Sequence, residues 1–299
     1  MKNEKKSLVL WRGSLCFLLL VLVFALLGAC AFADSQFTVD RAGTLTGFKG
    51  TDRDIVIPDN VKVIGPGAFS GKQGISSVTI PEGVTKIDTK AFYGCTGLRR
   101  VDFPSTLTEI GFQAFFNNDA LSDLDLPNGL KVIGEGAFSD CGALTELVIP
   151  DSVQTIDKTA FSLCNRLCEV TLGRSVRKLG NGAFTRCISL TEISLNDGLE
   201  EIGANAFSYS PIVELDIPDS VRKMDVSAIN SNNTSDVLRS SLKKLRWTSS
   251  IPEIPISQFN GFRALETVVL PEGVTDIKGS AFQSCEALRS VSLPQSLYS

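Results

Sequence analysis

Carboxylates and thiols are the side chains that offer reactive chemistry here, because the 299 residues include 33 Asp and Glu and 8 Cys but no histidine. Histidine is the commonest general base, proton shuttle and zinc ligand. The sequence also has no Gly-rich phosphate loop, no Gly-x-Ser-x-Gly motif and no closely spaced pair of Cys-x-x-Cys motifs. We therefore predict that the protein is not an enzyme, and we expect no catalytic residues, no metal site and no cofactor.

One set of carboxylates recurs at a step of 23 residues, with a single step of 22. Its members, which we take as candidate ligand-binding residues, are Asp123, Glu146, Glu169, Glu192 and Glu214. An enzyme that cleaves glycosides needs two carboxylates positioned in a cleft, whereas equivalent positions of stacked repeats form a shallow column. Two interpretations stay open. The column is either a solvated face that prevents aggregation, or a docking strip for a cation-bearing or basic protein partner.

Five cysteines share one position, three residues after a recurring phenylalanine: Cys95, Cys141, Cys164, Cys187 and Cys285. Cysteines of exported proteins often pair, so a disulfide or zinc role is one interpretation. Their identical repeat position favours the other, a buried ladder of small, soft side chains. Cys168 occupies a different position, where strand alternation points it outward, and we expect it to be exposed.

A 23-residue repeat underlies these spacings. The prolines at 58, 81, 104, 127 and 150 are 23 residues apart, Gly173 and Asn196 continue the step, and Pro218 comes one residue early. The step resumes through Thr248, Pro271 and Pro294 after an insertion of about seven residues within Asn230 to Ser241. Most units also carry an Ala-Phe pair, which predicts a buried phenylalanine position. The sequence therefore predicts eleven coils.

Apolar residues at every third position suit a coil that turns several corners and stacks on its neighbours, not a long helix or strand. Segments such as Leu121–Leu126 end in strict alternation, so we expect one short parallel strand there in each coil. Residues 37–47, with a turn at Asp40–Gly43, predict a hairpin that caps the first coil. The domains expected are a leader at 1–33, a cap at 34–57 and a solenoid at 58–299 with its insertion near 230–241.

The repeats resemble the BspA-like leucine-rich repeats of bacterial surface proteins over residues 37–299. The resemblance rests on motifs such as Val63-Ile64-Gly65-Pro66-Gly67-Ala68-Phe69 and its copy at 132–138. It implies a right-handed β-rich solenoid displayed outside the cell, which adheres to host, matrix or microbial proteins and has no catalytic residues. Two departures are Thr248 in the proline position and Ile229 in the phenylalanine position.

The first 33 residues read as a signal peptide, with a basic start, an apolar run from Leu15 to Leu27 and small residues after it. Two cleavage sites fit. Ala31-Phe32-Ala33 suits release of a soluble protein beginning at Asp34, and Leu27-Gly28-Ala29-Cys30 resembles a lipoprotein motif, although its glycine departs from the usual alanine or serine. Cys30 is therefore a lipidation candidate. We expect membrane contact only through the leader or this anchor.

The charge argues against nucleic acid as a partner. The formal net charge is −4, and the leader contributes +3, so the mature chain carries −7 and repels phosphate backbones. The leading hypothesis is an exported adhesion or protein-binding protein. The alternative is a structural envelope lipoprotein that associates with other envelope components or with itself through its last coil.

Overall fold

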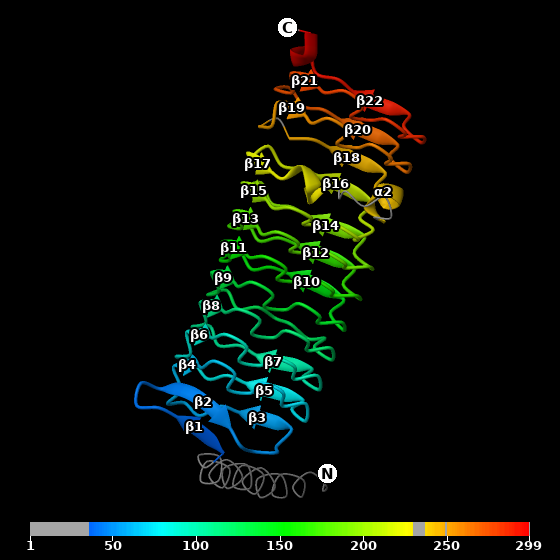
Figure 1. Cartoon of the computed structure of the whole chain (residues 1–299). Coiled ribbons are helices and arrows are strands. Elements are labelled where there is room, and N and C mark those ends of the chain that lie inside the picture. The colour runs from blue at the N-terminus through cyan, green and yellow to red at the C-terminus, as the bar shows by residue number, and fades with distance from the viewer. Residues whose placement is uncertain (1–35, 230–236, 249, 299) are drawn as a thin grey trace, which may run out of the picture.

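The protein is a solenoid whose coils stack along one axis (Figure 1). The structure is a computed structural model and describes residues 36–229, 237–248 and 250–298. Most coils add a strand to each of two surfaces, because residues one repeat apart pair in parallel register. The predicted β-rich architecture is confirmed.

The first face consists of three-residue parallel strands. The central residue of each strand except the last belongs to the core, as in Leu147, Val170 and Ile193. Its strands are β3 (Asp54–Val56), β5 (Ser77–Thr79), β7 (Arg100–Asp102), β10 (Glu146–Val148), β12 (Glu169–Thr171), β14 (Glu192–Ser194), β16 (Glu214–Asp216), β18 (Lys244–Arg246), β20 (Thr267–Val269) and β22 (Ser290–Ser292).

The second face consists of two-residue parallel strands, on another side of each coil. They are β4 (Val63–Ile64), β6 (Lys86–Ile87), β8 (Glu109–Ile110), β9 (Val132–Ile133), β11 (Thr155–Ile156), β13 (Lys178–Leu179), β15 (Glu201–Ile202), β17 (Lys223–Met224), β19 (Glu253–Ile254) and β21 (Asp276–Ile277). The described helical elements are short: η1 (Val226–Ala228), α2 (Leu238–Ser241) and η2 (Gln295–Tyr298).

The predicted N-terminal hairpin is confirmed. Strands β1 (Phe37–Val39) and β2 (Thr44–Phe48) pair antiparallel, and β2 then pairs with β4. The turn is fixed by Asp40, whose carboxylate accepts the N–H groups of Ala42 at 2.9 Å and Thr44 at 2.8 Å. The bond from Thr44 lowers the pKa of Asp40. Gly43 supplies the positive φ of 83° that closes the turn.

The predicted phenylalanine position forms the centre of the core. Phe69, Phe92, Phe115, Phe138, Phe161 and Phe184 are fully buried and stack face to face in consecutive coils. The ring centroids lie 4.7 Å apart at Phe69–Phe92 and 5.5 Å apart at Phe161–Phe184. Parallel stacking at this spacing follows from the coil step, which brings identical residues into line. In the last coil the same ring, Phe282, is half-buried.

The cysteine position is a hydrogen-bond donor position, which the sequence reasoning missed. Each of the five thiols donates to the carbonyl of the phenylalanine in the preceding coil, at 3.0 Å for Cys95 and 3.3 Å for Cys164. Asn118 and Ser210 replace cysteine in two coils and donate to the same carbonyl, at 2.9 and 2.7 Å. The expected buried ladder is confirmed for Cys95, Cys141, Cys164 and Cys187, whereas Cys285 is only partly buried.

Two expectations need correction. The segment Leu121–Leu126 forms no strand; its ladder contact is a single bridge between Asp123 and Arg100. One feature distinguishes this place: Phe103, in the preceding coil, puts a larger, half-buried ring where neighbouring coils have isoleucine or leucine. The insertion is also not wholly polar surface, because α2 lies within it and buries Leu238 completely. Residues 230–236 lie outside the described residues.

We expect Phe138→Ala to destabilise the solenoid strongly. The ring is fully buried and stacks on a neighbour on each side, so its removal leaves a cavity and costs about 3 to 5 kcal/mol. The melting temperature should fall by roughly 10 °C. Val148→Ala, at a side chain that is 68% exposed, is the control and should leave the melt nearly unchanged. An unaltered melt for Phe138→Ala would contradict the proposed core.

Thiol labelling should separate Cys168 from the ladder. Burial raises the pKa of Cys95 and Cys164 to about 12, so both stay as unreactive thiols at neutral pH. We expect iodoacetamide to modify the exposed Cys168 in the folded protein, and to reach Cys95, Cys141, Cys164 and Cys187 only after denaturation. Peptide mapping by mass spectrometry would measure this. Modification of Cys164 at the rate of Cys168 in the native protein would refute the assignment.

Candidate functional site

Three glutamates form an acidic row across the first face. Glu146, Glu169 and Glu192 begin β10, β12 and β14 and pair in register. All three are exposed, because the alternation of each strand buries the residue that follows. Parallel strands lie about 4.8 Å apart, so the acidic row is about 10 Å long. The predicted column is therefore a physical row over these coils.

Cations neutralise the column at both of its ends. Asp123 lies 3.6 Å from the guanidinium of Arg100, and Glu214 forms an ion pair with Lys244 in the next coil. A hydrogen bond to Asp102 raises the pKa of Arg100, which keeps this cation charged. Within the described part of the chain, by contrast, no cation pairs with a member of the acidic row. With partners counted among the described residues, the five predicted site residues thus fall into three unpaired carboxylates and two paired ones.

The second face shows that unpaired charge is not a general property of the coils. There Lys86 pairs with Glu109 at 3.1 Å, and Glu201 lies between Lys178 at 3.9 Å and Lys223 at 3.5 Å. The hydrogen bond to Glu109 raises the pKa of Lys86. Opposite charges directly across neighbouring strands stabilise a sheet, and like charges destabilise it. Repulsion between like charges therefore remains in the acidic row, whereas ion pairs relieve it on the second face.

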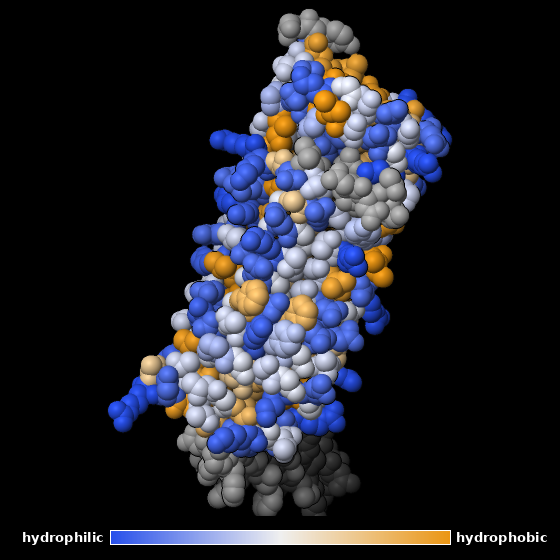
Figure 2. Space-filling view, viewed as in Figure 1, coloured by the Kyte–Doolittle hydropathy of each residue, from blue (hydrophilic) through white to orange (hydrophobic). Residues whose placement is uncertain are grey.

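The positions beside the acidic row are small and accessible. Val148 and Thr171, two residues further along their strands, are exposed, and so are Thr145 and Cys168 on the other side. Figure 2 shows hydrophobic residues scattered among hydrophilic ones on the side that it draws. The first face can therefore receive a broad partner without steric obstruction, and its chemistry is mainly polar.

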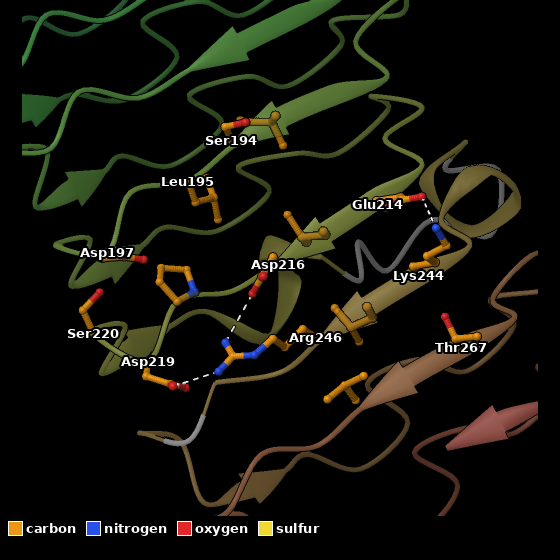
Figure 3. A pocket seen from close by; sticks show the side chains of 15 residues that line it. Ser194, Leu195, Asp197, Glu214, Asp216, Asp219, Ser220, Lys244, Arg246 and Thr267 are labelled. Atoms are coloured by element: carbon orange, nitrogen blue, oxygen red, sulfur yellow. Dashed lines mark hydrogen bonds and ion pairs between the residues drawn. The ribbon is translucent and has the colours of Figure 1, made fainter. Parts of the chain in front are cut away.

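A hollow of about 780 Å³ lies at the end of the acidic row, over β14, β16, β18 and β20, and it includes the gap between β14 and β16 (Figure 3). These two strands do not pair, because the sheet ends at β14 and a new one begins at β16. The hollow was missed by the sequence reasoning, although its signal was present. Pro218 arrives one residue early, since only Pro211 separates Ser210 from Ile212, where other coils have two residues.

The ion pairs of the hollow join cations of β18 to carboxylates of β16 and of the turn after it. The guanidinium of Arg246 donates to Asp216 at 3.2 Å and to Asp219 at 2.8 Å (Figure 3). The bond to Asp219 raises the pKa of Arg246. Asp197 lies across the hollow from this cluster (Figure 3). The two cations that line the hollow, Lys244 and Arg246, are thus already held by carboxylates.

Metal binding and membrane insertion have no support in the described residues. Within them, no three His, Cys, Asp or Glu side chains are placed to hold a metal ion. No helix in the same part of the chain is long and apolar enough to cross a bilayer. The lipidation candidate Cys30 lies outside the described residues.

Comparison with known proteins adds the family. The model of the BspA type leucine-rich repeat region, in 6 copies, matches residues 48–168, 154–245 and 237–299. The chain belongs to the BspA-type leucine-rich-repeat family. This confirms the resemblance drawn from the repeat motifs.

Solved structures of leucine-rich-repeat proteins share the fold. A leucine-rich repeat protein of T. pallidum is 32% identical, with a TM-score of 0.53, over 57% of this chain and 84% of its own. A leucine-rich repeat protein of Bacteroides ovatus is 23% identical, with a TM-score of 0.58, over 87% and 88%. The comparison with curated proteins found no match.

The two faces of this BspA-type solenoid should respond oppositely to loss of one carboxylate. Glu169→Gln removes the middle charge of the acidic row, so we expect the melting temperature to rise by about 1 to 2 °C at low salt. Glu201→Gln removes a partner of Lys178 and Lys223 and should lower it by a similar amount. Both effects should shrink at 1 M salt, where the Debye length is ~3 Å. If the melting temperature shifted in the same direction in both variants, the result would contradict unrelieved repulsion in the acidic row.

Proposed function

We propose that the protein is exported, displayed at the cell surface, and binds host, matrix or microbial proteins through its first face. The observation that carries the proposal is the acidic row, three exposed carboxylates in register without a cationic partner among the described residues. The repulsion between these carboxylates lowers the stability of the fold. A docking function explains why the three charges are kept despite this cost, and a purely structural role does not. A basic protein surface supplies the missing cations.

The rigid scaffold suits this role. Main-chain bonds hold Glu146, Glu169 and Glu192 at a fixed spacing, so a partner meets all three charges together. Charge complementarity of this kind raises the association rate and selects partners by sign. The leader at 1–33 supports export, and its basic, apolar and small-residue order is typical of signal peptides.

The binding role is tested by neutralising the acidic row. A panel of purified matrix and microbial surface proteins is screened for binding, and the affinity of the partner found is measured for Glu146→Gln/Glu169→Gln/Glu192→Gln. Exposed pairs are each worth less than about 1 kcal/mol, so we expect the triple change to weaken binding about tenfold at 0.1 M salt. The difference from wild type should nearly vanish at 1 M salt.

A matched control carries the same change in net charge on the second face: Glu109→Gln/Glu200→Gln/Glu201→Gln. These carboxylates already have cationic neighbours, and we expect binding close to wild type. Glutamine is preferred to lysine because it neither reverses the field nor changes the side-chain shape. Equal affinities for wild type and the acidic-row variant would exclude this row as the binding site.

The mode of display depends on which leader site is cleaved. If Cys30 is lipidated, as the envelope-lipoprotein alternative requires, the protein should partition into detergent, and Cys30→Ser should abolish this. If cleavage follows Ala33, the secreted product should begin at Asp34 and stay in the aqueous phase. Detergent partitioning with N-terminal sequencing distinguishes the two. A detergent-phase protein with an intact leader would contradict both.

A further inference from the structure

The hollow includes the gap between β14 and β16, where the first-face ladder opens at one end. At the start of the strands the chain stays joined across the gap, since Val213 N–H donates to the Thr191 carbonyl at 3.1 Å. At the other end, coils on both sides are bonded, as in Leu172 N–H to Ser194 at 3.0 Å and Ile217 N–H to Arg246 at 3.1 Å. The equivalent bond, from Leu195 N–H to the Asp216 carbonyl, is absent among the described backbone bonds.

Opening the ladder also releases one carboxylate. In three other coils the acidic residue after the proline position, Glu82, Asp151 or Glu272, accepts an N–H of the next coil. Glu82 accepts from Ser105 at 2.9 Å, and Asp151 accepts from Arg174 at 3.0 Å and pairs with its guanidinium. Asp197 occupies this same position, but the next coil places Asp219 there and is displaced by the gap. Among described residues, no donor reaches the Asp197 carboxylate.

The balance of charge in the hollow favours a cation. Its ionisable lining comprises the four carboxylates of Asp197, Glu214, Asp216 and Asp219 and the two cations of Lys244 and Arg246. Both cations are engaged by Glu214, Asp216 and Asp219, so an anion would have to break existing ion pairs. Asp197 is left to face a ligand. No three metal-binding groups converge in the described residues, which disfavours a bare metal ion.

The geometry points to the hollow as a docking site for an arginine side chain of the protein partner, an inference that rests on the proposed function. A guanidinium offers five donors in a planar fork, which suits the Asp197 carboxylate on one wall and the Asp216 carbonyl on another. It is also less strongly hydrated than an ammonium, so it enters a partly enclosed site at lower cost. The acidic row attracts the partner, and the hollow fixes its register.

A small probe tests the hollow separately from the acidic row. N-acetylarginine amide is titrated into the isotope-labelled protein, and amide shifts are followed by NMR; N-acetylcitrulline amide is the uncharged control of the same shape. We expect saturable shifts at Leu195, Asp197 and Asp216 with the arginine probe only. Asp197→Asn should weaken its binding at least fivefold, whereas Asp151→Asn, the matched variant two coils earlier, should not.

The outcomes separate the inference from the proposed function. Arginine-dependent shifts at the hollow that persist in the acidic-row triple variant support a distinct anchoring site. Three outcomes would each overturn the inference while leaving the acidic row as a binding surface. They are shifts confined to Glu146, Glu169 and Glu192, equal shifts with both probes, and probe binding that Asp197→Asn does not change. Absence of any shift with the arginine probe would overturn it as well. Loss of partner binding in the triple variant is measured independently and bears on the proposed function alone.

Discussion

Parallel main-chain hydrogen bonding between residues one repeat apart is the constraint on which the rest of the structure depends. It brings each residue next to its equivalents in the neighbouring coils, about 4.8 Å away. Phenylalanine rings therefore stack, as Phe138 does on Phe161 at 5.4 Å, and the thiol of Cys164 reaches the carbonyl of Phe138. The same constraint makes a repeated glutamate into a row of like charges. The same pairing register thus determines which residues stack in the core and which stack on the surface. A change in repeat length alters both.

The hollow shows what happens where the register fails. One residue fewer between Ser210 and Ile212 leaves the core in place, because Ser210 still bonds the carbonyl of Phe184 at 2.7 Å and Ile212 stays buried. The irregularity appears at the surface instead, where Leu195 N–H does not bond the carbonyl of Asp216. A missing residue in a solenoid is accommodated locally, since each coil contacts only its neighbours. The fold therefore tolerates an irregularity that gives an otherwise flat face a recess.

The sequence predicted what repetition controls and missed what depends on contacts between different positions. Proline spacing and the Ala-Phe pair predicted the coils and the buried rings, and the Asp40–Gly43 turn predicted the hairpin cap. The position of Cys168, outside the cysteine ladder, predicted its exposure. The ion pairs of Arg100 with Asp123 and Lys244 with Glu214 depend on side-chain reach across coils, which spacing alone does not reveal. The donor role of the cysteine position had a signal in Asn118 and Ser210, since both substitutes can donate a hydrogen bond. The early Pro218 indicated an irregular coil but not that its ladder would open.

The two faces differ in how their charges are arranged, and this difference makes the acidic row a better candidate for function than the charged residues of the second face. Both faces stack charged residues at the same spacing, so both face the same electrostatic problem. On the second face Lys178, Glu201 and Lys223 alternate in sign in successive coils, which stabilises the sheet at no cost to solubility. If the first face had to provide only solubility, alternating positive and negative residues would do so equally well. Three consecutive carboxylates supply something different, a concentrated field of one sign held on a rigid surface, and such a field acts on molecules of opposite charge that approach from outside.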